Sequence, residues 1–125
     1  MNNEQKPRTY YNRAGLTGSQ AGHKGQYPVL ELRFSVWNKE EKAQQNKFHM
    51  LFLTEENNQK NRETLQLLGV DNVPEVVNVD AVKELRGLGF RTVDLVEETN
   101  DAGYANIKYI NEPKYGQKVF DLEQK

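Results

Sequence analysis

The chain of 125 residues contains no cysteine, which excludes disulfides, thiolate metal sites and cysteine nucleophiles. It has only two histidines, His23 and His49, and their separation matches no metal-ligand spacing. No run approaches the roughly 18 apolar residues that a membrane helix requires. The opening residues, MNNEQKPRTYYNR, have no apolar segment behind their charges, unlike a signal peptide. We therefore expect a cytoplasmic protein with no membrane association, no metal and no other cofactor.

Enzyme motifs are also missing from the sequence. The segment GLTGSQAG, residues 15–22, has glycines but lacks the lysine–hydroxyl pair of a phosphate-binding loop. Asp94 and Glu98 would share one strand face, but without a matching lysine motif a solvated face is favoured over a nuclease-like metal cluster. No nucleophile is accompanied by its base. The sequence thus predicts a protein that is not an enzyme.

Charge is nearly balanced over the whole chain but not within its two parts. Residues 1–53 hold eight Lys/Arg and four Asp/Glu (+4), and residues 54–125 hold nine Lys/Arg and fourteen Asp/Glu (−5), which together give the total of −1. A total near zero argues against a nucleic-acid binder that works by bulk charge. It permits a localised basic face, and ordinary solvated surface charge is the alternative.

Residues 26–37, QYPVLELRFSVW, alternate as a β-strand with one buried face. The apolar face holds Pro28, Leu30, Leu32, Phe34 and Val36. The opposite face carries Arg33 and Trp37, so a cation and a large aromatic are expected to face solvent.

A further strand is expected over residues 47–53, KFHMLFL. Lys47 and His49 share one of its faces, and Phe48 and Phe52 share the other. Alternation alone leaves open which face is inward, and the two phenylalanines are favoured as core residues.

The other segments complete a mainly β pattern with one or two helices. We expect a strand over 8–16, a glycine-containing loop over 17–26, a helix within 54–70 that ends at Gly69, a short helix over 79–89, a strand over 90–98, a turn at 99–103 and a strand over 104–110. Five strands with a helix between the third and fourth is the order of an OB-fold barrel, and an open antiparallel sheet with helices on one side is the alternative. The domain would span 8–111, between a disordered N-terminus, 1–7, and a polar tail, 112–125.

Cations and aromatics exposed together on a sheet are typical of proteins that bind single-stranded nucleic acid. Each base stacked on an aromatic ring is worth about 1–3 kcal/mol, and Lys/Arg neutralise the phosphates. Arg33 is the strongest candidate because it lies in mid-strand opposite an apolar face, although it could instead pair with Glu31 or a cross-strand acid. The full set of candidates is Tyr10, Arg13, Lys24, Arg33, Trp37, Lys47, His49, Arg91, Tyr104 and Lys108.

Core and turn positions within residues 24–111 repeat a family pattern. They are Pro28, Leu30, Leu32, Phe34 and Val36; Leu67, Leu68, Gly69 and Val70; Leu85, Gly87, Phe90, Val93 and Leu95; and Tyr104, Asn106, Ile107 and Tyr109. The pattern resembles a family of small phage-encoded single-stranded DNA-binding proteins. The resemblance implies an OB-fold that coats single-stranded DNA in phage replication or recombination, in the host-cell cytoplasm, with replication or recombination proteins as partners.

The C-terminal tail departs from that family. Its members often carry an acidic tip that recruits partner proteins, whereas this tail, PKYGQKVFDLEQK, ends in lysine. The alternative function is a structural or protein-interaction domain on the same scaffold, for which a homo-oligomer is expected. Near-neutral charge and the acidic second part of the chain motivate that alternative.

Overall fold

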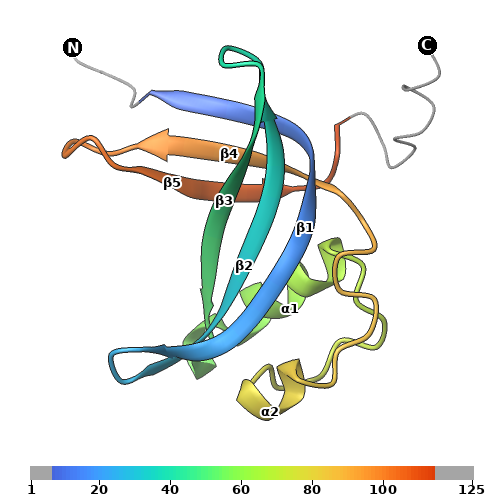
Figure 1. The fold of residues 1–125 in the computed structure, drawn as a ribbon. Coiled ribbons are helices and arrows are strands. Elements are labelled where there is room, and N and C mark those ends of the chain that lie inside the picture. The colour runs from blue at the N-terminus through green and yellow to red at the C-terminus, as the bar shows by residue number, and fades with distance from the viewer. Residues whose placement is uncertain (1–6, 115–125) are drawn as a thin grey trace.

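The computed structural model describes residues 7–114, which form one antiparallel sheet and short helices (Figure 1). The elements are β1 (Arg8–Lys24), β2 (Tyr27–Asn38), β3 (Ala43–Phe52), a 3₁₀ turn (Glu55–Asn57), α1 (Asn58–Leu67), α2 (Val79–Val82), β4 (Val93–Thr99) and β5 (Ala105–Asn111). Of the N-terminus expected to be disordered, 1–7, all but Pro7 lies outside the described residues, as does the tail beyond Lys114. None of the described helices is long and apolar enough to cross a membrane.

The five strands are ordered β3-β2-β1-β4-β5, so the long strand β1 is at the centre of the sheet. Its first half pairs with β4 and its second half with β2. Between the halves a bulge places Arg13 at φ 58°, and the Arg13 backbone N–H donates to Asp94 Oδ1 at 3.0 Å. Such a bulge bends a strand, and the sheet curls until the edge strands β3 and β5 approach each other (Figure 1). The predicted mainly β architecture, with five antiparallel strands in one sheet and a helix between the third and fourth, is confirmed; the curled sheet is consistent with a barrel-like fold but is not closed.

The predicted loop over 17–26 is wrong, because β1 continues to Lys24 and only a two-residue turn, Gly25–Gln26, follows. Gly25 has φ 62°, a conformation that glycine adopts without strain. Ser19 and Ala21 lie opposite Leu32 and Leu30, so backbone pairing with β2 holds a segment whose own residues are poor strand formers.

Three other predicted boundaries differ from the observed ones. The strand expected at 47–53 begins at Ala43, the strand expected at 90–98 begins at Val93, and the second helix covers only Val79–Val82.

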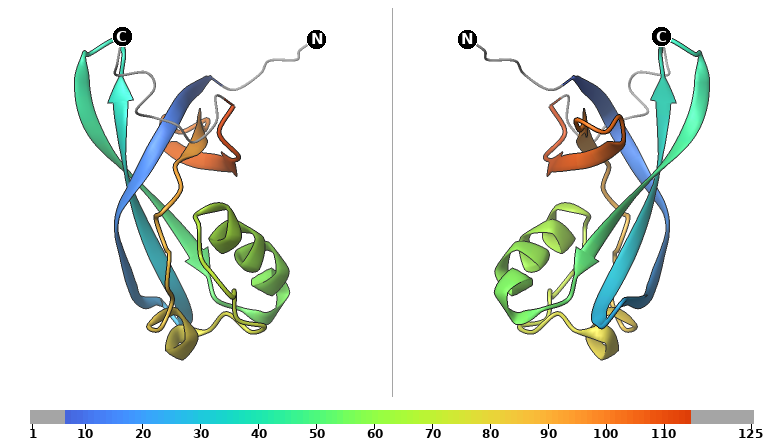
Figure 2. Two further views of the ribbon diagram at one scale, coloured as in Figure 1. Left: turned by 90° about the vertical axis from the view of Figure 1, so that its right-hand side faces the viewer. Right: turned by 90° about the vertical axis from the view of Figure 1, so that its left-hand side faces the viewer.

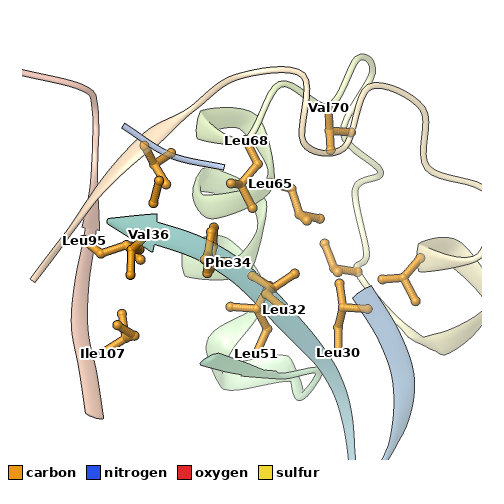
Figure 3. Packing of buried hydrophobic residues seen from close by; sticks show 14 of the residues in the cluster. Leu30, Leu32, Phe34, Val36, Leu51, Leu65, Leu68, Val70, Leu95 and Ile107 are labelled. Carbon is orange, nitrogen blue, oxygen red and sulfur yellow. The ribbon is translucent and has the colours of Figure 1, made fainter. Parts of the chain in front are cut away.

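The apolar face of β2 makes the centre of the core, as alternation predicted. Leu32 and Phe34 are fully buried, and they belong to one cluster with Leu65 of α1 and Leu68, the C-cap residue of that helix (Figure 3). Each such side chain contributes about 1.5–3 kcal/mol by burial. Figure 2 shows α1 on the concave side of the curved sheet. The odd-numbered residues of β2 therefore face away from the helix.

Local bonds fix both ends of α1 in place. The buried Asn61 donates from Nδ2 to the carbonyl of Phe52 at 2.8 Å, which ties the helix to the end of β3. At the other end the N–H groups of Gly69 and Val70 donate to the carbonyls of Gln66 and Leu65, both at 3.1 Å. This is a Schellman motif, with Gly69 at φ 101°, so the predicted end of the helix at Gly69 is confirmed.

Candidate nucleic-acid interface

The candidate site is the convex side of β1, β2 and β3, which we call the outer face (Figure 2). Residues paired across neighbouring antiparallel strands present their side chains on the same face. Gly18 of β1, Arg33 of β2 and Phe48 of β3 form one such row. The expectation that Phe48 belongs to the core is therefore wrong, whereas the solvent-facing position of Arg33 is confirmed.

Three large aromatic side chains are exposed along this face. Trp37 is 54% exposed, Phe48 53% and Tyr27 48%. The Tyr27 ring meets the ring of Phe52 edge to face, with centroids 6.2 Å apart. Tyr27 begins β2 and Trp37 is its penultimate residue, about 33 Å further along the strand at the rise of an extended chain. Flat apolar surfaces thus recur along the whole length of β2.

Arg33 lies across the middle of the outer face. Its Nε donates to Thr17 Oγ1 at 3.2 Å, and a Cβ at position 18 would lie 2.6 Å from its Nη2, so the guanidinium occupies the space that Gly18 leaves. Neither ion pair found within residues 7–114 involves Arg33, so the alternative of a pairing with Glu31 is not observed. The remaining guanidinium donors are available to a ligand.

A shallow hollow of about 120 Å³ lies beside Arg33. It is lined by Gly18, Ser19, Gln20, Glu31, Arg33 and Phe48. One cation, one aromatic ring and several hydrogen-bonding side chains therefore converge on one spot of the outer face.

At the far end of β2 the face continues onto β1. Trp37 and Tyr10 line a common cavity of about 350 Å³. Tyr10 is exposed and its neighbour Tyr11 is buried, as predicted for adjacent tyrosines on a strand. At the opposite end Lys24 is exposed and pairs in register with Tyr27. Of the predicted site residues, the structure brings Tyr10, Lys24, Arg33 and Trp37 to this continuous surface.

Lys47 is not on the outer face, because it pairs in register with the core residue Phe34. Its Nζ lies 2.9 Å from Glu97 Oε2 and 5.4 Å from the centre of the Tyr11 ring. The Tyr11 hydroxyl donates to Glu97 Oε1 at 3.2 Å. Burial lowers the pKa of Lys47, but the hydrogen bond and charge of Glu97 outweigh it and hold the pKa above the ordinary 10.5. Lys47 thus belongs to an internal polar cluster.

His49 also points inward, opposite Leu32. Its surroundings disfavour a charged ring, because burial and the nearby charge of Lys60 on α1 lower the pKa of His49. Neither Lys47 nor His49 is therefore in a position to line the outer face.

None of the other four predicted residues lines the hollow beside Arg33 or the cavity shared by Trp37 and Tyr10. Arg13 is partly buried at the β1 bulge, and Lys108 is exposed at a bulge of β5. Arg91 precedes β4, with its N–H donating to the carbonyl of Leu68 at 3.3 Å near the end of α1. Tyr104 is exposed in the turn between β4 and β5, where its N–H donates to Asn100 Oδ1 at 2.9 Å.

The carboxylates of β4 have structural partners. Asp94 accepts from the N–H groups of Arg13 and Lys114, and Glu98 forms an ion pair with Arg8 at 3.0 Å. Within residues 7–114 no three His, Asp or Glu side chains group as metal ligands.

Comparison of the chain with family models, curated proteins and solved structures finds no match.

Proposed function

We propose that this protein binds single-stranded DNA on the outer face, without catalysis and without requiring one fixed sequence. The observation that carries the proposal is the row of Tyr27, Phe48 and Trp37 around an arginine that has no carboxylate partner in the described chain. Each exposed ring offers about 1–3 kcal/mol of base stacking, and Arg33 offers donors to phosphate.

We further propose that the sheet is an OB-type barrel. Three features support this proposal: β1 pairs with both β2 and β4, β3 approaches β5, and α1 follows β3 and precedes β4 in the chain. OB-folds bind oligonucleotides on the face of their second and third strands, where the outer face lies. The setting suggested by the family resemblance is phage DNA replication or recombination in the host-cell cytoplasm, alongside proteins of those processes.

The fluorescence of Trp37, the single tryptophan, tests this proposal directly. Titration with a thymine oligonucleotide is expected to quench the signal to saturation, and more weakly at high salt because counterions compete for the phosphates. Phe48→Ala should weaken binding by roughly 5- to 150-fold, the equivalent of one lost stack. Arg33→Ala should weaken binding and reduce its dependence on salt.

Phe90→Ala is the matched control. Phe90 is 82% exposed, but it lies beside Gly69 at the end of α1 rather than on the outer face. Equal losses in Phe48→Ala and Phe90→Ala would contradict the proposed location. Flat fluorescence together with no mobility shift at low salt would rule out DNA binding and favour a protein-interaction face, since exposed aromatics are also typical of such surfaces.

A further inference from the structure

A carboxylate lies in the middle of the outer face. Glu31 pairs in register with Gln20 of β1 and Met50 of β3, one position along the sheet from the row of Arg33 and Phe48. It is partly buried and lines the same hollow as those two residues. Within residues 7–114 its carboxylate forms no hydrogen bond and no ion pair.

This position is informative because the proposed ligand is a polyanion. A phosphate close to Glu31 would meet a like charge on a surface where screening is weaker than in bulk water. Arg33 projects from the same strand about 6.6 Å away, twice the rise per residue. A DNA strand that places phosphate on Arg33 therefore avoids repulsion only if it turns a base, not its backbone, toward Glu31.

We infer that Glu31 and the hollow beside Phe48 form a base-reading subsite that prefers guanine, an inference that rests on the proposed DNA binding. A carboxylate only accepts hydrogen bonds. The Watson–Crick edge of guanine presents two adjacent donors, N1–H and the N2 amino group, which match the two carboxylate oxygens. Thymine presents one N–H between two carbonyl oxygens, and adenine and cytosine present an amino group beside an acceptor nitrogen.

The other walls of the hollow suit a base held in this way. Phe48 supplies a ring for stacking, and Gln20, which pairs in register with Glu31, supplies an amide group. A bidentate contact between side chain and base discriminates between bases by roughly tenfold or more. The outer face would then bind single strands generally but hold guanine at one position.

The experiment uses the full chain and thymine oligonucleotides in which one central base is varied. Guanine is expected to bind roughly tenfold more tightly than thymine, and inosine, which lacks the N2 amino group, to lose most of that gain. Glu31→Gln should abolish the preference for guanine while binding the all-thymine strand at least as tightly as the wild type. Glu84→Gln, which removes an exposed carboxylate just beyond α2, should leave the preference unchanged.

Two results would overturn the inference, and they differ from each other. If the wild type binds guanine, inosine and thymine strands equally and Glu31→Gln strengthens all three alike, then Glu31 only repels phosphate and the proposed DNA binding still holds. If no strand binds at low salt, the proposed function itself is wrong. The comparison of guanine with inosine needs no variant, so it does not depend on how Glu31→Gln folds.

Discussion

The internal ion pair between Lys47 and Glu97 makes a prediction about stability that can be worked out from its geometry. Only 21% of the Lys47 side chain and 10% of the Glu97 side chain are exposed. Lys47→Met leaves the Glu97 carboxylate buried with one hydrogen bond, from Tyr11. Removing one partner of a buried pair costs about 3–5 kcal/mol, and partial exposure favours the lower end. We expect the free energy of unfolding to fall by about 3 kcal/mol, measured by urea denaturation.

Removing both charges should restore most of that loss. In Lys47→Met/Glu97→Leu no buried charge lacks its partner, and an apolar pair commonly replaces an ion pair at little cost. The Tyr11 hydroxyl loses its acceptor, which costs about 1 kcal/mol. The double variant should therefore unfold within about 1 kcal/mol of the wild type, although each single variant is much less stable.

The same double variant tests whether Lys47 contacts DNA. A lysine that neutralises one phosphate of a single strand contributes about 0.7 to the slope of log affinity against log salt. Because Lys47 points inward, we expect an unchanged slope. A slope reduced by about 0.7 would place Lys47 at the phosphate backbone, and a Lys47→Met variant as stable as the wild type would refute the internal ion pair.

Three further outcomes follow from individual contacts. Gly18→Ala should leave the free energy of unfolding unchanged or raise it by up to about 1 kcal/mol, since glycine weakens strands. It should nevertheless weaken DNA binding in the fluorescence titration, because the added Cβ displaces the Arg33 guanidinium. Unchanged affinity would show that Arg33 needs no fixed position. Burial and the charge of Glu97 raise the pKa of Tyr11 above 10.0, and the pKa of Lys47 is raised above 10.5. The stability that these two groups contribute is therefore complete below about pH 10 and is lost as pH rises through their folded-state pKa values. The urea midpoint should fall more steeply above pH 10 in the wild type than in Lys47→Met/Glu97→Leu, and parallel curves would contradict this. Asn61→Ala should cost about 1–3 kcal/mol in urea denaturation because it leaves the Phe52 carbonyl without its donor, whereas the exposed Asn106→Ala should cost almost nothing.

The parts of the fold that could be predicted are those in which local pattern and tertiary packing agree. The alternation of β2 is complete from Leu30 to Val36, and a strand buried on one face is the arrangement that hides all of these side chains. The second half of β1 could not be predicted, because Gly18, Gly22 and their small polar neighbours carry almost no local preference for a strand. They are held by backbone pairing to β2, which no local window of sequence contains.

The predicted length of the second helix was too great for a similar reason. Gly87 suited the end of a helix over 79–89, but its φ of 87° serves a close approach of two backbone segments instead. Gly69 and Gly87 lie against each other with no room for a side chain on either. A glycine that permits close packing and a glycine that caps a helix look the same in the sequence, and only the packing partner separates them.

On the outer face, alternation within a strand predicts the orientation of some side chains, whereas the orientation of others depends on how neighbouring strands pair. Arg33 and Trp37 were predicted to face solvent because the other side of β2 is wholly apolar. On β3 both faces contain apolar residues, and local preference favoured Phe48 inside over Lys47. The answer depends on pairing: Phe48 lies opposite Arg33, and Lys47 lies opposite Phe34. Strand register is a tertiary property, so the sequence of β3 alone does not contain it.

That orientation of β3 is consistent with the proposed binding face. Leaving Phe48 half exposed forgoes part of the roughly 1.5–3 kcal/mol that its burial would contribute. The opposite face of the strand buries a lysine that then requires Glu97 as a partner. A one-residue shift of β3 against β2 would reverse both features, but it would also turn the buried Leu51 away from the core. Local rules are broken most often where a surface has a task other than folding. Here the half-exposed Phe48 lies opposite Arg33, on the proposed binding face.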